Sequence, residues 1–162
     1  MSPLHEGVRA AGSLYLRPET IDDREFLADL YISTREAELP YFGKALLRTQ
    51  YEMRRMQYLA RFPGTAPSVI ATSHAPCGTL WLAESADEIR IVDIALLPQF
   101  RNRGLGTNVL LDLISRADLE FKPLTLTVSK TNPGACRLYQ RLGFVIIEDL
   151  GMDLAMRREP RS

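Results

Sequence analysis

The sequence has little of what several common functional classes need. Its 162 residues hold only two cysteines, Cys77 and Cys136, and two histidines, with no paired ligand spacing, so neither a disulfide framework nor a zinc site is expected. Twenty acidic residues cancel twenty basic ones, which argues against general nucleic-acid or membrane-surface binding. No apolar run approaches the ~20 residues of a membrane helix, and the first residues lack the apolar centre of a signal peptide. We therefore expect a cytoplasmic protein with no metal, no membrane and no nucleic acid among its partners.

The length and an ordinary composition, 46 % apolar and 25 % charged, predict one domain over residues 13–162 after a flexible tail over residues 1–12. Alternation, helical periodicity and turn signals predict the order strand, helix, helix, three strands, helix, strand, helix and two strands. The strands are expected at 13–17, 68–73, 78–85, 88–97, 123–128, 144–149 and 151–157, and the helices at 25–36, 43–62, after 104 and at 132–142. Short gaps between the three middle strands favour an antiparallel meander. The whole order fits one mixed sheet with helices on its faces.

The helix expected over 43–62 is amphipathic. Its apolar stripe consists of Leu47, Tyr51, Tyr58 and Phe62, and its basic side chains, Lys44, Arg48, Arg54 and Arg55, lie mostly off that stripe. We interpret the basic side chains as a solvated face.

The stretch RNRGLGTN, residues 101–108, lies between an apolar strand pattern and an amphipathic helix. A helix start carries unpaired N–H groups and the positive end of the helix dipole, so it attracts anions. Gly104 and Gly106 have no Cβ, which lets an oxygen approach the main chain closely. The two arginines and Thr107 can add hydrogen-bond donors. This chemistry predicts a pyrophosphate site.

Two of three known phosphate-loop patterns fail here. The P-loop pattern needs a lysine that this stretch lacks. The dinucleotide-binding pattern needs a third glycine, but Val109 stands at that position, and the carboxylate expected about 20 residues later is also missing. The third pattern, R/Q-x-x-G-x-G/A, is filled by RNRGLG. Two family signatures occur in the right order along the chain. The first is the loop with its flanks, IALLPQFRNRGLGTNVLLDLI, and the second is NPGACRLYQRLGF at 132–144. The chain therefore resembles the GNAT N-acetyltransferase superfamily over residues 13–157.

The resemblance implies an α/β (α+β) architecture, with a mixed, mostly antiparallel sheet of about six or seven strands flanked by about four helices. It implies acetyl-coenzyme A as the co-substrate. Its pantetheine arm would lie along the end of the 88–97 strand, and its pyrophosphate in the glycine loop. The coenzyme-binding residues expected on this basis are Ile94, Ala95, Leu96, Leu97, Arg101, Asn102, Arg103, Gly104, Leu105, Gly106, Thr107, Asn132 and Tyr139.

Tyr139 is the expected general acid, because in many members of the superfamily the tyrosine at this place protonates the leaving thiolate. From the residues alone, Tyr139 fits equally a core position on a short helix, capped by Asn132, opened by Pro133 and ended by Gly143. Both interpretations stay open.

The general base is less clearly marked. In EIRIVDIALL, Asp93 is a carboxylate on an otherwise apolar strand face, and such an exception is informative. It could accept the proton of the amine, hold a cationic substrate, or form a structural pair with an arginine. Glu84, at the end of the preceding strand, is the rival. The resemblance leads us to expect a glutamate on the later strand, where Arg90 and Val92 stand instead.

The function expected is transfer of an acetyl group from acetyl-coenzyme A to a primary amine by direct attack in a ternary complex. The alternative is a non-catalytic acyl-coenzyme A sensor or partner subunit with the same fold. The acceptor, a small molecule or a peptide or protein, is not identified by the sequence, and a homodimer is one expected assembly. The aromatic residues Tyr41, Phe42, Tyr51, Tyr58 and Trp81 are candidates for the acceptor site, although core packing is the favoured interpretation.

Overall fold

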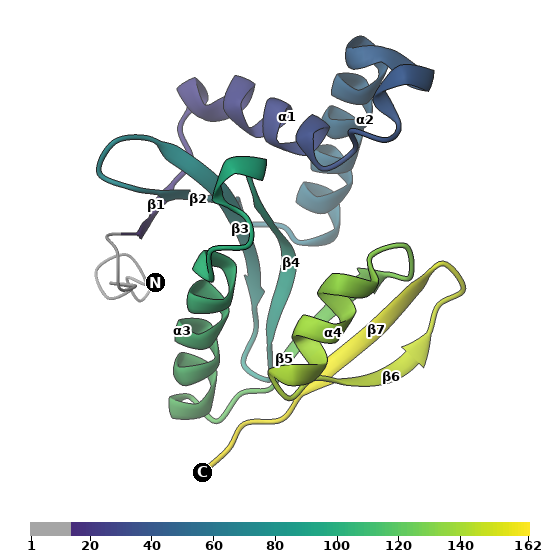
Figure 1. Ribbon diagram of the computed structural model, residues 1–162. Coiled ribbons are helices and arrows are strands. Elements are labelled where there is room, and N and C mark those ends of the chain that lie inside the picture. Colours follow the sequence, from purple (N-terminus) through teal and green to yellow (C-terminus); the bar gives the residue numbers. More distant parts are fainter. Residues whose placement is uncertain (1–13) are drawn as a thin grey trace. The chain divides into compact units, whose positions relative to one another are not determined.

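The computed structural model describes residues 14–162, and the predicted tail lies outside them. The elements are β1 (Tyr15–Pro18), η2 (Ile21–Asp23), α1 (Arg24–Ser33), α2 (Leu39–Arg61), β2 (Ser68–Ala71), β3 (Pro76–Glu84), β4 (Ile89–Leu96), η3 (Pro98–Phe100), α3 (Leu105–Leu119), β5 (Leu124–Ser129), α4 (Pro133–Arg141), β6 (Val145–Asp149) and β7 (Asp153–Arg158). This order of strands and α-helices is the predicted one (Figure 1). β3 begins at Pro76, inside the predicted turn, because a proline is tolerated at the first position of a strand.

Seven strands form the sheet in the order β1-β2-β3-β4-β5-β7-β6. The β1–β2, β2–β3, β5–β7 and β6–β7 pairs are antiparallel, and the β4–β5 pair is parallel. The predicted mixed, mostly antiparallel sheet with four helices is therefore confirmed. The ladder between β4 and β5 covers only Ile89 to Ile91 on β4, so β4 continues beyond it for the rest of its length.

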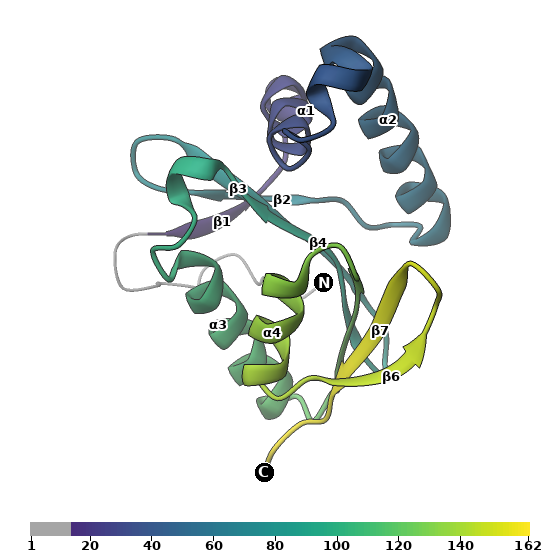
Figure 2. The ribbon, with the colours of Figure 1, turned by 45° about the vertical axis from the view of Figure 1, so that its right-hand side comes forward.

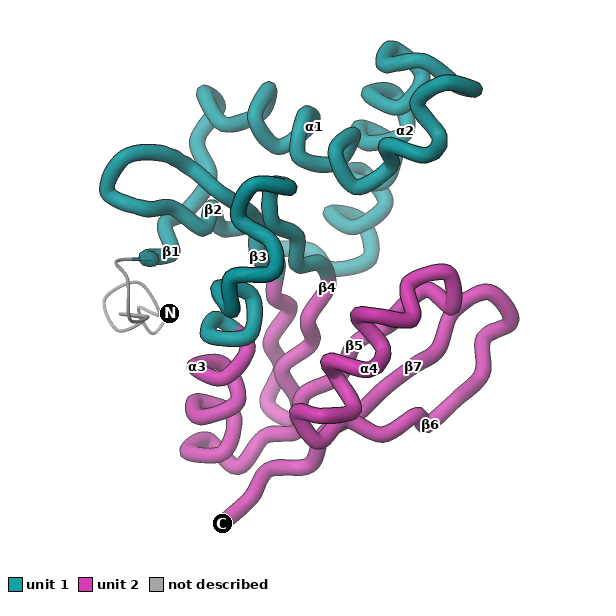
Figure 3. The backbone as a smooth tube through the Cα atoms, in the orientation of Figure 1, with its two compact units in different colours: residues 1–81, 93–109 teal, residues 82–92, 110–162 magenta. Residues whose placement is uncertain are grey.

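The chain forms two compact units, coloured separately in Figure 3. Of the described residues, one unit contains 14–81 and 93–109, and the other contains 82–92 and 110–162. Within residues 14–162, no helix is long and apolar enough to cross a membrane.

In the first unit, a capping box at Thr20 starts the helical region. The Asp23 carboxylate accepts a hydrogen bond from the Thr20 N–H at 2.8 Å and two from the Arg17 guanidinium at 2.7 and 2.8 Å. The local sequence is typical of such a cap, because Thr20 is followed by Asp22 and Asp23 in the first turn. α1 and α2 pack side by side (Figure 2). The buried Leu30 of α1 and Leu47 of α2 belong to the core of this unit.

In the second unit, β5 lies between β4 and β7, and its Leu124 and Leu126 are buried. α4 begins as predicted, since Asn132 Oδ1 accepts a hydrogen bond from the Ala135 N–H at 3.1 Å. It ends at Arg141, shortly before Gly143, whose φ of 95° lies in the left-handed region that favours glycine.

Candidate active site

The glycine loop turns directly into α3. Asn102 and Gly104 take φ values of 58° and 76°, which reverse the chain before the helix. The Asn108 N–H donates to the Gly104 carbonyl at 2.9 Å, so the three preceding amides, at residues 105–107, have no helical acceptor. A Cβ added at Gly106 would meet only the Leu96 side chain, at an ordinary 3.5 Å. The neighbouring protein atoms therefore leave space beside Gly106. An anion that binds at a helix start needs such space.

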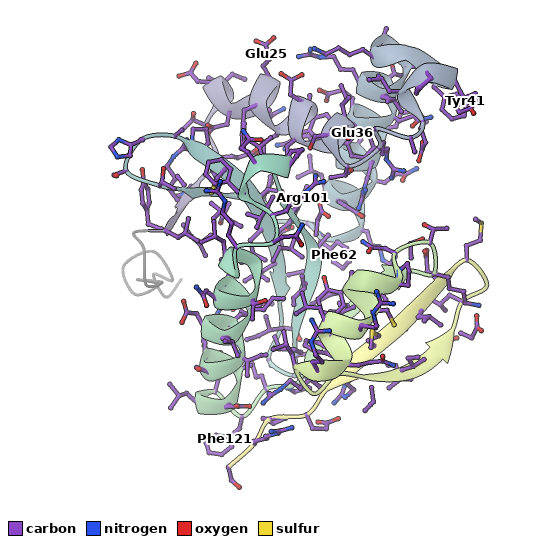
Figure 4. The ribbon with its side chains drawn as sticks, viewed as in Figure 1. Glu25, Glu36, Tyr41, Phe62, Arg101 and Phe121 are labelled. Carbon is purple, nitrogen blue, oxygen red and sulfur yellow. The ribbon has the colours of Figure 1, made fainter. Side chains whose placement is uncertain are left out.

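The two loop arginines are placed differently. The Arg101 Nε donates to the Leu96 carbonyl at 2.8 Å, and its Nη2 reaches Ser33 Oγ at 3.4 Å. Figure 4 labels this side chain beside the turn that follows β4. Arg103 is exposed. Arg101 thus ties the loop to the end of β4 and to α1, while Arg103 keeps its charge in solvent.

β3 and β4 approach each other unusually closely at Gly78. A Cβ on this residue would lie 2.4 Å from the Ala95 carbonyl oxygen and 2.6 Å from the Leu96 side chain. Nearby, the Leu97 N–H donates to the Cys77 carbonyl at 2.9 Å. The Leu97 amide is therefore already bonded within the protein.

A pocket lies within the first unit, between α1, α2 and the strands. Its empty volume, mouth included, is about 510 Å³. Its lining is largely aromatic and aliphatic, with two arginines and one carboxylate: Leu27, Leu30, Tyr31, Thr34, Tyr51, Arg54, Arg55, Tyr58, Pro67, Thr79, Trp81, Asp93 and Ala95. Asp93 and Ala95 both line it, as the alternation along β4 predicts.

Asp93 is the carboxylate of this pocket. Its side chain keeps 32 % of its surface accessible, on a strand that runs into the glycine loop. Burial raises the pKa of the Asp93 carboxyl above its usual value, and this effect exceeds the opposing influence of Arg54, of the Ile94 N–H and of Arg35. Asp93 therefore holds a proton more readily than an ordinary aspartate does.

Arg54 and Arg55 contradict the predicted solvated face. Arg55 is buried, and both of its terminal nitrogens bond the Glu19 carboxylate. The half-buried Arg54 donates from Nε to Tyr58 Oη at 2.8 Å, and its Nη2 lies 3.5 Å from Asp93 Oδ1. The helical pattern placed both residues off the apolar stripe, but the carboxylates that draw them inward come from distant parts of the chain.

Comparison with known proteins identifies the family. A sequence profile of the acetyltransferase (GNAT) family matches residues 28–144. The chain belongs to the GNAT acetyltransferase family. A search of curated protein sequences finds no significant match.

Solved structures have the same GNAT fold. One is the PaiA N-acetyltransferase of Thermoplasma acidophilum in complex with coenzyme A, with 16 % identity, a TM-score of 0.70, and coverage of 91 % of this chain and 99 % of that one. A GNAT acetyltransferase of Elizabethkingia anophelis with acetyl-coenzyme A bound has 20 % identity, a TM-score of 0.61, and coverage of 92 % and 99 %. Ard1 of Thermoplasma volcanium has 21 % identity, a TM-score of 0.62, and coverage of 93 % and 99 %.

The aromatic candidates of this GNAT chain divide into two groups. Tyr51, Tyr58 and Trp81 line the pocket, and Trp81 donates from Nε1 to Thr65 Oγ1 at 2.8 Å. Tyr41 is 84 % exposed and, with Phe42, is outside the pocket lining; Figure 4 shows Tyr41 at the outer end of α2. Both come before Gly43, whose φ of 73° interrupts α2.

The remaining site candidates lie in the second unit. Glu84 accepts hydrogen bonds from Arg116 Nη1 and Nη2 at 2.8 and 2.5 Å, so its carboxylate is held in an ion pair. Tyr139 is buried on α4, with its ring 5.6 Å from that of Phe144. Residues 14–162 contain no group of three or more histidines, cysteines or acids that could hold a metal.

Sequence reasoning missed Arg54 as a site residue. The sequence signal that could have indicated a partner was the single carboxylate, Asp93, on an apolar strand face. A carboxylate in such surroundings requires a cation nearby. With twenty lysines and arginines in the chain, that signal alone does not identify the partner.

Proposed function

We propose that this chain transfers an acetyl group from acetyl-coenzyme A to a primary amine by direct attack in a ternary complex. Membership of the GNAT family supports acyl transfer in general. The observation that carries the finer proposal is Asp93, a carboxylate of raised pKa in a pocket, on the strand that leads into the glycine loop. A module that only binds acyl-coenzyme A has no need of such a group.

In this proposal the donor lies along β4 and the start of α3. The amides of residues 105–107 and the exposed Arg103 bind the pyrophosphate, since unpaired helix N–H groups and a guanidinium both favour phosphate oxygens. The main chain of Ile94 to Leu96 is beyond the β5 ladder, so it can pair with the pantetheine arm. The Leu97 N–H is bonded to the Cys77 carbonyl, so it is not assigned to the acetyl carbonyl.

The reaction needs a base and an acid. Asp93 accepts a proton from the acceptor's ammonium group, and the neutral amine attacks the acetyl carbonyl. The carbon–nitrogen bond forms, the tetrahedral intermediate collapses, and the carbon–sulfur bond breaks. The thiolate gains a proton from the Tyr139 hydroxyl, the second proton of the nitrogen passes to solvent, and solvent reprotonates Tyr139. Asp93 then returns its proton to solvent, so one proton is released overall.

Asp93 is preferred to Glu84 as the base. Protonation of Glu84 would break its two-bond ion pair with Arg116. Asp93 is accessible from the pocket, and its single contact with Arg54 is long, at 3.5 Å. Its proton transfer therefore disturbs less of the surrounding structure.

The test measures release of the coenzyme A thiol with a panel of amines. Replacing Asp93 by asparagine should lower kcat/KM by ~100-fold or more and remove the acidic limb of its pH profile, because an amide accepts no proton. Asp87→Asn, in the exposed β3–β4 turn, is the matched control.

Two results would contradict the proposal. Unchanged turnover and pH dependence in the Asp93 variant would reject Asp93 as the base. Tight acetyl-coenzyme A binding without thiol release on any amine would favour the non-catalytic binding module instead.

A further inference from the structure

We propose that the acceptor is an α-amino acid with a free carboxylate and an apolar or aromatic side chain, a substrate class that rests on the proposed acetyl transfer at Asp93. In this arrangement Asp93 receives the ammonium group and Arg54 binds the carboxylate. The juxtaposition that leads to this proposal is a loosely paired arginine and aspartate inside a mainly apolar pocket.

The pocket charges form two pairs of unequal strength. Arg55 bonds Glu19 through two nitrogens and is neutralised by it. Arg54 and Asp93 meet through one contact at 3.5 Å, the outer limit of a hydrogen bond. When Asp93 binds an ammonium group, Arg54 loses its counter-charge, and a half-buried guanidinium without a counter-charge is costly. A carboxylate on the same ligand restores the balance.

Arg54 is held in place for such a ligand. Its Nε is fixed by Tyr58 Oη at 2.8 Å, and its guanidinium lies 5.1 Å from the Tyr58 ring centre and 5.7 Å from that of Tyr31. A planar guanidinium held in this way suits two-point binding of a carboxylate better than a lysine would.

The remaining lining suits an apolar side chain. Leu27, Leu30, Tyr51 and Trp81 form much of the wall. A polyamine would bring several positive charges toward Arg54, the lining arginine that Glu19 does not neutralise. The pocket therefore favours a zwitterion over a polycation.

The experiment compares acceptors that differ only in the carboxylate. L-phenylalanine is paired with 2-phenylethylamine, L-leucine with isopentylamine, and L-methionine with 3-(methylthio)propylamine, and spermidine represents polycations. At least one amino acid should exceed its amine by ~10-fold or more in kcat/KM, since a hydrogen-bonded charge pair contributes about that much.

The variant Arg54→Gln tests the cause of this preference. It should lower the ratio of kcat/KM for the amino acid to kcat/KM for the matched amine by ~10- to 100-fold. It should also move the acidic limb of the pH profile upward, because loss of a nearby cation raises the pKa of Asp93. Arg48→Gln, on the exposed side of α2, should change neither.

The outcomes separate the two proposals. Turnover of amines or spermidine equal to that of the amino acids, or a preference that survives Arg54→Gln, overturns the substrate class and leaves acetyl transfer standing. If no acceptor is turned over, calorimetry with the same pairs decides: Arg54-dependent binding of an amino acid supports the pocket assignment while rejecting the enzyme, and no such binding overturns both.

Discussion

Replacing Asp23 by asparagine should destabilise the protein at neutral pH but not in acid. Asp23 closes the junction between β1 and α1, where its side chain is only 8 % exposed. Hydrogen bonds from Arg17, and then the backbone of Thr20, outweigh burial and lower its pKa from 3.8 to about 2. The substitution keeps the shape of the side chain and removes the charge that these donors bind.

The magnitude follows from this change in pKa. Each pKa unit corresponds to about 1.4 kcal/mol, so the full effect is about 2 kcal/mol, and solvent screening at the 33 % exposed Arg17 reduces it to about 1–2 kcal/mol. Because the pKa is lower in the folded state, this stabilisation is complete above the unfolded pKa near 3.8 and is lost as the pH falls toward about 2.

Urea unfolding of the wild type and the variant between pH 7 and pH 3 measures the effect. The difference in the free energy of unfolding should be largest at pH 7 and should begin to shrink below about pH 4. Asp22→Asn removes an exposed acid from the same helical turn and should cost less than about 0.5 kcal/mol. An equal cost for both variants, or a difference that does not depend on pH, would refute this reasoning.

Three further substitutions test the coenzyme site. Gly78→Ala places a Cβ 2.4 Å from the Ala95 carbonyl oxygen, so it should cost about 1–3 kcal/mol in thermal unfolding and weaken acetyl-coenzyme A binding, whereas Gly134→Ala should be tolerated. Gly106→Trp should abolish acetyl-coenzyme A binding in calorimetry with little loss of stability, and unchanged affinity would reject the loop assignment. Tyr139→Phe should lower kcat by ~100-fold with nearly unchanged acetyl-coenzyme A affinity, and normal turnover would return this side chain to a purely structural role.

The fold could be predicted because its signals are local. The capping box at Thr20 and the cap at Asn132 each depend on residues within three positions of each other. The glycine loop between β4 and α3 is a continuous stretch of sequence whose chemistry could be read directly. The helical turn that begins at Leu39, before Gly43, and the start of β3 at Pro76 differ from expectation, because both are boundaries at which glycine and proline allow more than one conformation.

The acceptor pocket could be predicted only in part, because its energetics depend on pairs far apart in sequence. Asp93 was identified from its own strand, but Arg54 is 39 residues away and Glu19, which neutralises Arg55, is 36 residues from its partner. The adjacent arginines of α2 thus differ in role. Arg55 is neutralised by Glu19, whereas Arg54 is available to a ligand, and helical periodicity does not distinguish the two. The distinction depends on which carboxylate each arginine meets, and the proposed preference for a zwitterion rests on that distinction. In the proposed function, a continuous stretch of sequence therefore encodes the donor site, and long-range ion pairing encodes acceptor specificity.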